Sequence, residues 1–128
     1  MKATIPFHLK VGRVGELLAQ KHLLKEGYQI IQTNYKEKWG EIDIIASLKK
    51  LLVFVEVKTI INRNFNFKNA SLKPEDEVTL KKLNNLNKTI LHYLNKNHLE
   101  NDYRLDLIAI EINPETKKYR LRHFKGIN

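Results

Sequence analysis

Residues 40–59 decide the fold, and they read GEIDIIASLKKLLVFVEVKT. Two runs rich in β-branched and apolar residues, 41–46 and 51–59, flank a polar stretch at 47–50. This pattern is typical of two strands joined by a turn. The apolar residues of 51–55 fall on both faces of the second strand. We therefore expect that strand to be central in a sheet that is covered on both sides.

Four charged side chains are expected to converge on one face of these strands: Glu41, Asp43, Glu56 and Lys58. Side chains alternate along a strand, so residues two apart share a face. With the turn at 47–50, Ala46 pairs with Leu51. The same register places Asp43 opposite Phe54, and Glu41 opposite Glu56. A bulge or a three-residue loop would change this register.

Carboxylates gathered in this way repel one another and lose hydration, so something must compensate for them. Mg²⁺ or Mn²⁺ would do so, because these ions prefer carboxylate, carbonyl and water oxygens. Lys58 beside such an ion would orient or deprotonate a water molecule, or stabilise negative charge in a transition state. This arrangement indicates metal-assisted hydrolysis of a phosphodiester. From spacing alone, a structural alternative has equal weight: Glu56 and Lys58 form an ion pair at the sheet rim, and Asp43 caps a turn.

The rest of the chain predicts five further elements: a helix over 12–26, a strand over 28–35, a helix over 74–97, and strands over 104–112 and 117–124. The apolar stripe of the first helix is predicted to be Val14, Leu17, Leu18 and Leu24. That of the second is predicted to be Leu83, Leu86, Ile90 and Leu94. The order α-β-β-β-α-β-β predicts one α/β domain over residues 1–128, a mixed sheet flanked by helices.

Composition narrows the function. The 128 residues carry 23 Lys and Arg against 14 Asp and Glu, a net charge of +9, which favours a polyanionic partner such as nucleic acid. The absence of cysteine excludes disulfides and thiol nucleophiles. The five histidines lack metal-ligand spacing, so we expect no zinc site. No apolar run approaches the roughly 20 residues of a membrane span, and the N-terminus lacks an apolar leader. We expect a cytoplasmic protein without a membrane partner.

The two strand motifs, Gly40–Ala46 and Val53–Thr59, resemble the core of PD-(D/E)XK nucleases. More closely, the chain resembles the YraN-like family of uncharacterised bacterial endonuclease-like proteins. Its N-terminal pattern is matched by Gly12, Gly15, Glu16, Ala19, Gly27, Tyr28, Asn34 and Tyr35, and its C-terminal pattern by Lys81, Arg104, Leu105 and Asp106. The resemblance covers nearly the whole chain. It implies the restriction-endonuclease-like fold, similar to that of archaeal Holliday junction resolvases.

The resemblance also implies roles for site residues. Asp43 and Glu56 would be metal ligands, together with the main-chain carbonyl of Val57, and the ion would be Mg²⁺ or Mn²⁺. Lys58 would be the catalytic lysine. Glu16 matches the carboxylate of the first helix that reaches the metal site in related nucleases, directly or through water.

The sequence departs from the family pattern at Ile60, where an arginine usually follows Val-Lys-Thr. Arg63 in the long predicted loop 60–73 could replace that arginine. The residues expected to contact nucleic acid are Arg63, Lys68, Lys73 and Lys81. Phe65 and Phe67 in the same loop could stack on bases of branched or single-stranded DNA, or fold back onto the core.

Two function classes follow. The first is a divalent-metal-dependent DNA endonuclease acting on DNA that is branched, as the resolvase likeness suggests. Symmetric cleavage of a junction needs two active sites and hence a homodimer, although no interface is indicated. The second is a non-catalytic nucleic-acid-binding module that retains the nuclease fold. A protein partner of a DNA-processing complex is a third reading. We expect Asp106, among apolar neighbours, to be hydrogen-bonded structurally.

Overall fold

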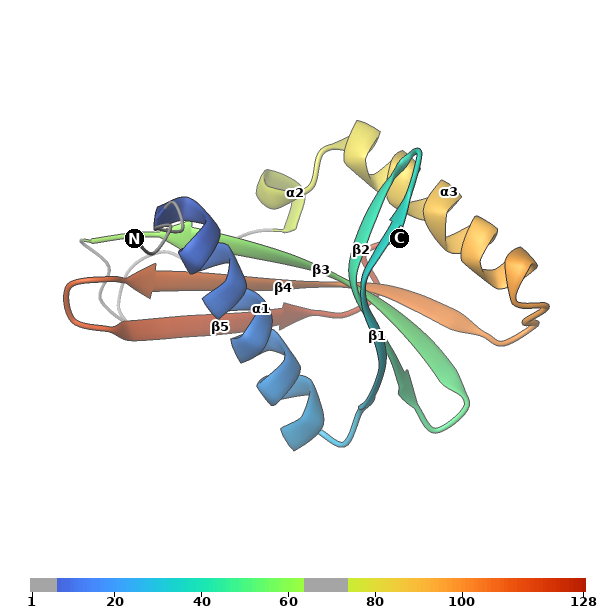
Figure 1. Ribbon diagram of the computed structural model, residues 1–128, viewed down its shortest axis with the longest axis horizontal. Helices are drawn as coiled ribbons and strands as arrows, with labels where there is room; N and C mark the ends of the chain where they lie inside the picture. The colour runs from blue at the N-terminus through green and yellow to red at the C-terminus, as the bar shows by residue number, and fades with distance from the viewer. Residues whose placement is uncertain (1–6, 64–73) are drawn as a thin grey trace, which may run out of the picture.

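The computed structural model describes residues 7–63 and 74–128. In chain order, these ranges contain α1 (Phe7–Lys25), β1 (Gln29–Glu37), β2 (Gly40–Leu48), β3 (Leu51–Ile61), α2 (Pro74–Glu77), α3 (Leu80–Lys96), β4 (Tyr103–Asn113) and β5 (Lys118–Phe124). The strands form a mixed sheet in the order β1-β2-β3-β4-β5, in which only β3 and β4 run parallel (Figure 1). The predicted α/β class and its element order are confirmed, with the single turn α2 as an addition. No helix in the described ranges is long and apolar enough to cross a membrane.

β3 is the central strand, and both of its faces are covered as predicted. On one face Leu23 of α1 packs in a cluster with Val53 and Val55. On the other face Ile90 of α3 packs with Phe54. Figure 1 shows α1 crossing the sheet and α3 lying against it beside the β1–β2 hairpin. This layering places the end of β3, with its charged residues, between two helices.

The predicted apolar stripe of α1 is wrong. Val14, Leu17 and Leu24 are 46%, 64% and 58% exposed, and Leu18 is only partly buried. The buried residues instead recur every fourth position: Val11, Gly15, Ala19 and Leu23. Small residues lie at the centre of this stripe because the helix backbone approaches β3 closely. A Cβ atom at Gly15 would overlap the Thr59 hydroxyl oxygen.

Gly15→Ala is therefore expected to destabilise the protein by about 1–3 kcal/mol, the usual cost of overpacking a tight contact. Gly12→Ala is the matched control, because a Cβ there meets nothing within 4 Å and alanine favours a helix interior by about 0.5–1 kcal/mol. Urea unfolding of both variants would measure the difference. The double variant with Thr59→Ala should recover most of the loss; equal stability of the two single variants would contradict the close approach.

The predicted hairpin register is wrong by two residues. Ala46 pairs with Val53 instead of Leu51, and Leu48 pairs with Leu51. The turn contains two residues, of which Lys49 has a left-handed φ of 57°, as two-residue hairpin turns require. The pairing of β2 with β3 ends at Ile44 and Val55, so the predicted pairs Asp43–Phe54 and Glu41–Glu56 do not form. Ile42 and Ile45, three residues apart, pack in the same cluster. The regular alternation from which one shared face was predicted for the charged residues therefore does not continue through Asp43 and Glu41.

The predicted helix over 74–97 is interrupted. After α2, the chain leaves helical conformation at Thr79, whose φ and ψ are −72° and 159°. Thr79 is the N-cap of α3, and its hydroxyl oxygen accepts a hydrogen bond from the Lys82 amide at 3.1 Å. A capping threonine satisfies one of the free amides at a helix start. The cap consequently fixes where α3 begins and which of its residues face the sheet.

Asp106 of β4 anchors the C-terminal end of the fold. It is fully buried and accepts two hydrogen bonds from the Arg104 guanidinium, at 2.7 and 2.8 Å. His123 of β5 lies 2.7 Å from the same carboxylate, and the Gly126 amide donates to it at 3.0 Å. The sequence-based expectation that Asp106 is hydrogen-bonded structurally is confirmed. This carboxylate ties β4, β5 and the chain end together.

Candidate functional site

The site lies where β2 and β3 part. Their paired register ends at Ile44 and Val55. Beyond this last pair, the Val57 amide of β3 donates a hydrogen bond of 2.7 Å to the Asp43 carboxylate of β2. The side chain of Asp43 thus takes the place of a backbone acceptor at the point of divergence. This hydrogen bond holds the Asp43 carboxylate where the paired region ends, against Val57, the residue that follows Glu56.

An irregularity in β1 accompanies this divergence. Thr33 pairs with Ile44 and Tyr35 with Ile42, so Asn34 lies across from Asp43. Asn34 has a left-handed φ of 55°, a conformation that asparagine tolerates better than most residues. Beyond Asn34 the β1–β2 hairpin curves toward α3 (Figure 1). Tyr35 and Ile42 there belong to the same hydrophobic cluster as Ile90 of α3.

Asp43 is surrounded by other carboxylates. Burial first, and then the charges of Glu56, Glu16 and Glu41, together raise the pKa of Asp43 to about 7, although the hydrogen bond from the Val57 amide lowers it. Burial, then the charge of Glu41, also raises the pKa of Glu16 on α1. The structure therefore brings the predicted carboxylates of α1, β2 and β3 into one electrostatic group.

Glu56 is the most constrained member of this group. It is only 8% exposed. Its Oε1 atom lies 3.1 Å from the Lys82 ammonium, whereas its buried Oε2 atom has no hydrogen-bond partner among the described residues. Burial raises the pKa of Glu56 even though the charge of Lys82 opposes this. A buried acceptor without a partner is costly, and a hard cation is the kind of ligand that would satisfy it.

Lys82 is a site residue that the sequence analysis missed; the family pattern directed attention to its neighbour Lys81, which is exposed. A helical signal was present. Lys82 precedes Leu86 by four residues and Ile90 by eight, so it continues the buried stripe of α3 by one turn. Lys58 is exposed on β3, and its charge is a smaller influence on Glu56.

The donor set has the chemistry of a Mg²⁺ or Mn²⁺ site, with carboxylate oxygens and one unsatisfied acceptor. In the described ranges, however, no three His, Asp or Glu side chains are grouped closely enough to hold an ion. Lys82 supplies the positive charge next to Glu56 instead. The residues therefore fit a divalent cation in kind, and a ligand set would form only if side chains moved closer together.

Of the residues expected to contact nucleic acid, Lys68 and Lys73 lie outside the described residues, as do Phe65 and Phe67. Arg63 is exposed, and its Nε atom lies 3.5 Å from Glu115 in the β4–β5 turn. Ile60 belongs to β3 and pairs with Glu111 of β4. The predicted loop thus begins after Ile61, two residues later than expected.

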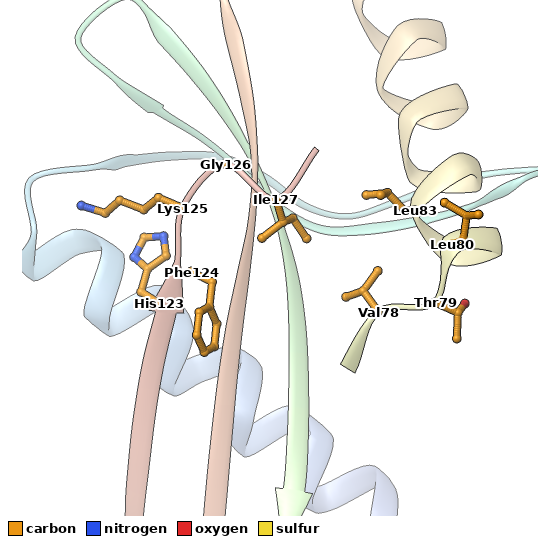
Figure 2. Close-up of a pocket in the computed structure, with 9 residues that line it drawn as sticks. All are labelled: Val78, Thr79, Leu80, Leu83, His123, Phe124, Lys125, Gly126 and Ile127. Carbon is orange, nitrogen blue, oxygen red and sulfur yellow. The ribbon is translucent and has the colours of Figure 1, made fainter. Parts of the chain in front are cut away.

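A cavity of about 810 Å³ adjoins the first turn of α3, on the side away from the hairpin tip. Figure 2 shows the residues that line it: Val78, Thr79, Leu80, Leu83, His123, Phe124, Lys125, Gly126 and Ile127. The α3 residues face the C-terminal stretch across this space. The clustered carboxylates do not line it.

A contact between histidines was also beyond the sequence analysis. His22 Nε2 of α1 lies 3.1 Å from His123 Nδ1 of β5, although 101 residues separate them. Burial, and next the neighbouring His123, lowers the pKa of His22. Since His123 also contacts Asp106, this pair joins α1 to the anchor of the C-terminal end.

The profile of the family described as "Uncharacterised protein family UPF0102" matches residues 15–110. The chain belongs to this family. UPF0102 is the YraN family that the sequence motifs indicate. The matched range includes Glu16, Asp43, Glu56 and Lys82, so the whole carboxylate group lies inside it.

Curated UPF0102 proteins are similar over most of their length. A protein of Alkaliphilus oremlandii is 38% identical over 118 residues, which cover 91% of this chain and 96% of that protein. One of Flavobacterium psychrophilum is 36% identical and covers 92% of each chain. One of Caldanaerobacter subterraneus is 40% identical and covers 82% of each. Their names state no activity.

Proposed function

We propose that this UPF0102 protein is a divalent-metal-dependent endonuclease that hydrolyses phosphodiester bonds in DNA. The observation that carries the proposal is the buried acidic group at the divergence of β2 and β3. The pKa values of Asp43 and Glu56 are both raised, first by burial, and Glu56 Oε2 has no hydrogen-bond partner among the described residues. Such an arrangement costs stability, and perturbed, mutually repelling groups concentrate at functional sites.

The proposal gives each residue a role. Asp43 and Glu56 would hold Mg²⁺ or Mn²⁺ together with the Val57 carbonyl, and Glu16 would support the site from α1. Lys58, exposed beside the site, orients or deprotonates water or stabilises charge on the phosphate. When bound, the cation neutralises the negative charge that develops on the phosphoryl oxygens. The resemblance to PD-(D/E)XK nucleases supports the same assignment.

DNA is the proposed substrate because the net charge of +9 favours a polyanion. Branched DNA is favoured by the likeness to junction resolvases. The second candidate function is a binding module without catalysis. Two observations favour it: Ile60 stands where the family usually has an arginine, and the positive charge beside Glu56 comes from Lys82.

A cleavage assay separates these functions. Purified protein is incubated with junction, flap, nicked and duplex DNA in Mg²⁺, in Mn²⁺ and in EDTA, with Glu56→Gln as the matched inactive variant. The endonuclease predicts cleavage that needs the metal and is lost in the variant. The binding module predicts no cleavage and salt-sensitive DNA affinity that neither EDTA nor Glu56→Gln changes. Equal cleavage by both proteins would indicate a contaminating nuclease.

A further inference from the structure

We propose that Lys82 is a built-in counterion of the carboxylate site: it holds Glu56 in the metal-free protein, releases it when a divalent cation binds there, and then contacts a DNA phosphate. The inference rests on the proposed function and adds a residue and a sequence of events to it. Lys82 is thereby a positioning residue in the metal-free protein and a substrate-binding residue in the loaded one.

The two side chains of the Lys82–Glu56 ion pair differ in their exposure to solvent. The side chain of Glu56 is 10% exposed and that of Lys82 is 53% exposed, with 3.1 Å between Nζ and Oε1. The carboxylate is held in place by the sheet, whereas the ammonium comes in from solvent at the end of a flexible stem. A buried carboxylate requires a cationic partner, but a half-exposed lysine is solvated well enough to leave. Lys82 is therefore the member of the pair that can move.

The surroundings of Lys82 also favour movement. It lies in the first turn of α3, beside the cavity of about 810 Å³ that Val78, Thr79 and Leu83 border (Figure 2). Val78 and Leu83 are only partly buried where they pack against the core, and Leu80 in the same turn is 74% exposed. By contrast, Leu86 one turn later is buried against the sheet. The helix turn that carries Lys82 thus borders open space, whereas the next turn is packed.

Lys82 and a divalent cation would compete for Glu56 because both are positively charged. A divalent cation on this carboxylate and an ammonium 3.1 Å from one of its oxygens would lie close together and repel each other. Since no three acidic or histidine side chains in the described ranges are grouped closely enough for an ion, Glu56 has to shift toward the other carboxylates. Release by Lys82 permits that shift. The freed ammonium then lies next to the site where the phosphate has to bind.

The first test is Mn²⁺ affinity without DNA, measured by calorimetry on wild type, Lys82→Met and the matched control Lys88→Met, a change at an exposed lysine of the same helix. Lys82→Gln is the second variant in case methionine impairs folding, which circular dichroism would reveal. We expect removal of Lys82 to tighten Mn²⁺ binding by about two- to fivefold, the scale of a half-exposed ion pair. Lys88→Met should bind like wild type. Weaker binding after loss of Lys82 would overturn the proposal, because Lys82 would then be a supporting partner of Glu56 in the loaded site.

The second test follows Lys82 to the DNA. Affinity for a short junction with phosphorothioate linkages, chosen to resist hydrolysis, is measured at several salt concentrations with and without Mn²⁺. In Mn²⁺, the salt slope of the wild type should exceed that of Lys82→Met by about 0.9, one phosphate contact. Without Mn²⁺ the two slopes should agree, since Lys82 is then held by Glu56. Slopes that agree under both conditions would remove the phosphate contact.

The counterion role of Lys82 and the metal site can be refuted separately. If wild type binds Mn²⁺ in a manner that Glu56→Gln abolishes, but loss of Lys82 tightens nothing, the counterion proposal is wrong and the metal site stands. If neither wild type nor the Lys82 variants bind Mn²⁺ even with branched DNA present, both the proposed function and this inference are wrong.

Discussion

Asp43→Asn is expected to abolish DNA cleavage and, at the same time, to stabilise the metal-free protein. Loss of a metal ligand should lower the cleavage rate by at least about 10²–10³-fold, the usual effect of removing one group that stabilises the transition state. The asparagine oxygen can still accept the hydrogen bond from the Val57 amide. What disappears is a buried charge among Glu16, Glu41 and Glu56. We expect a gain of about 1 kcal/mol, a rise in Tm of about 3–5 °C.

The matched control for this variant is Asp102→Asn at an exposed aspartate, which should change neither quantity. Thermal unfolding in EDTA and the cleavage assay on the same preparations give the two readouts. A lower Tm would favour the structural alternative, in which Asp43 serves the fold by capping a turn. Retained cleavage with a higher Tm would place catalysis elsewhere.

Asp106→Asn is expected to have the opposite effect on stability. It leaves the Arg104 guanidinium and His123 facing a neutral group in a buried setting, and breaking a buried charge pair in this way costs about 3–5 kcal/mol. Urea unfolding at neutral pH measures the loss, with Asp102→Asn again as the exposed control. A change below about 1 kcal/mol would show that the anchor contributes little to stability.

The same residue predicts a pH dependence. Burial alone would raise the pKa of Asp106, but hydrogen bonds from His123, Arg104 and Gly126 outweigh it and lower the pKa. A carboxyl group whose pKa is lower in the folded than in the unfolded state stabilises the fold above its unfolded pKa of about 3.9. That contribution is lost as the pH falls from there through the folded pKa. The stability difference between wild type and Asp106→Asn should therefore narrow below about pH 4.

The sequence predicted the sheet well because the runs of apolar and β-branched residues in β2 and β3 are a strong signal. The register was wrong by two residues, and the regular pairing ends at Ile44 and Val55, before the charged residues. The turn was placed at 47–50, but its two central residues were missed because Lys49 adopts a left-handed φ without the Asn-Gly or Asp-Gly signal that usually marks such turns.

Helix packing was predicted less well, for physical reasons. The pattern of large apolar residues selected Leu17 and Leu24, but the helix approaches β3 so closely that only Gly15 and Ala19 fit between them. The hydrophobicity of a side chain indicates how much free energy its burial would gain, but not whether the space between helix and sheet can hold it. The break before α3 depended on Thr79 serving as a cap, a role that many threonines in helical sequences do not take.

The carboxylates of the candidate site were predicted from the sequence, whereas the lysine that pairs with Glu56 was missed. Asp43 and Glu56 lie in short strand motifs whose spacing indicates the chemistry, and the family resemblance added Glu16. Lys82 is 26 positions beyond Glu56 and reaches it only because α3 packs on the same face of the sheet. The His22–His123 contact is likewise a product of tertiary structure. Contacts between distant segments leave no trace in local spacing.

The central claim is that the carboxylates at the divergence of β2 and β3 bind a divalent cation. The most direct measurement is a calorimetric titration of Mn²⁺ into wild type and Glu56→Gln, each with a short branched DNA present so that a phosphate can complete the site. The account predicts saturable binding by the wild type that Glu56→Gln loses. Identical titrations of the two proteins would contradict it and would leave the binding module as the better description.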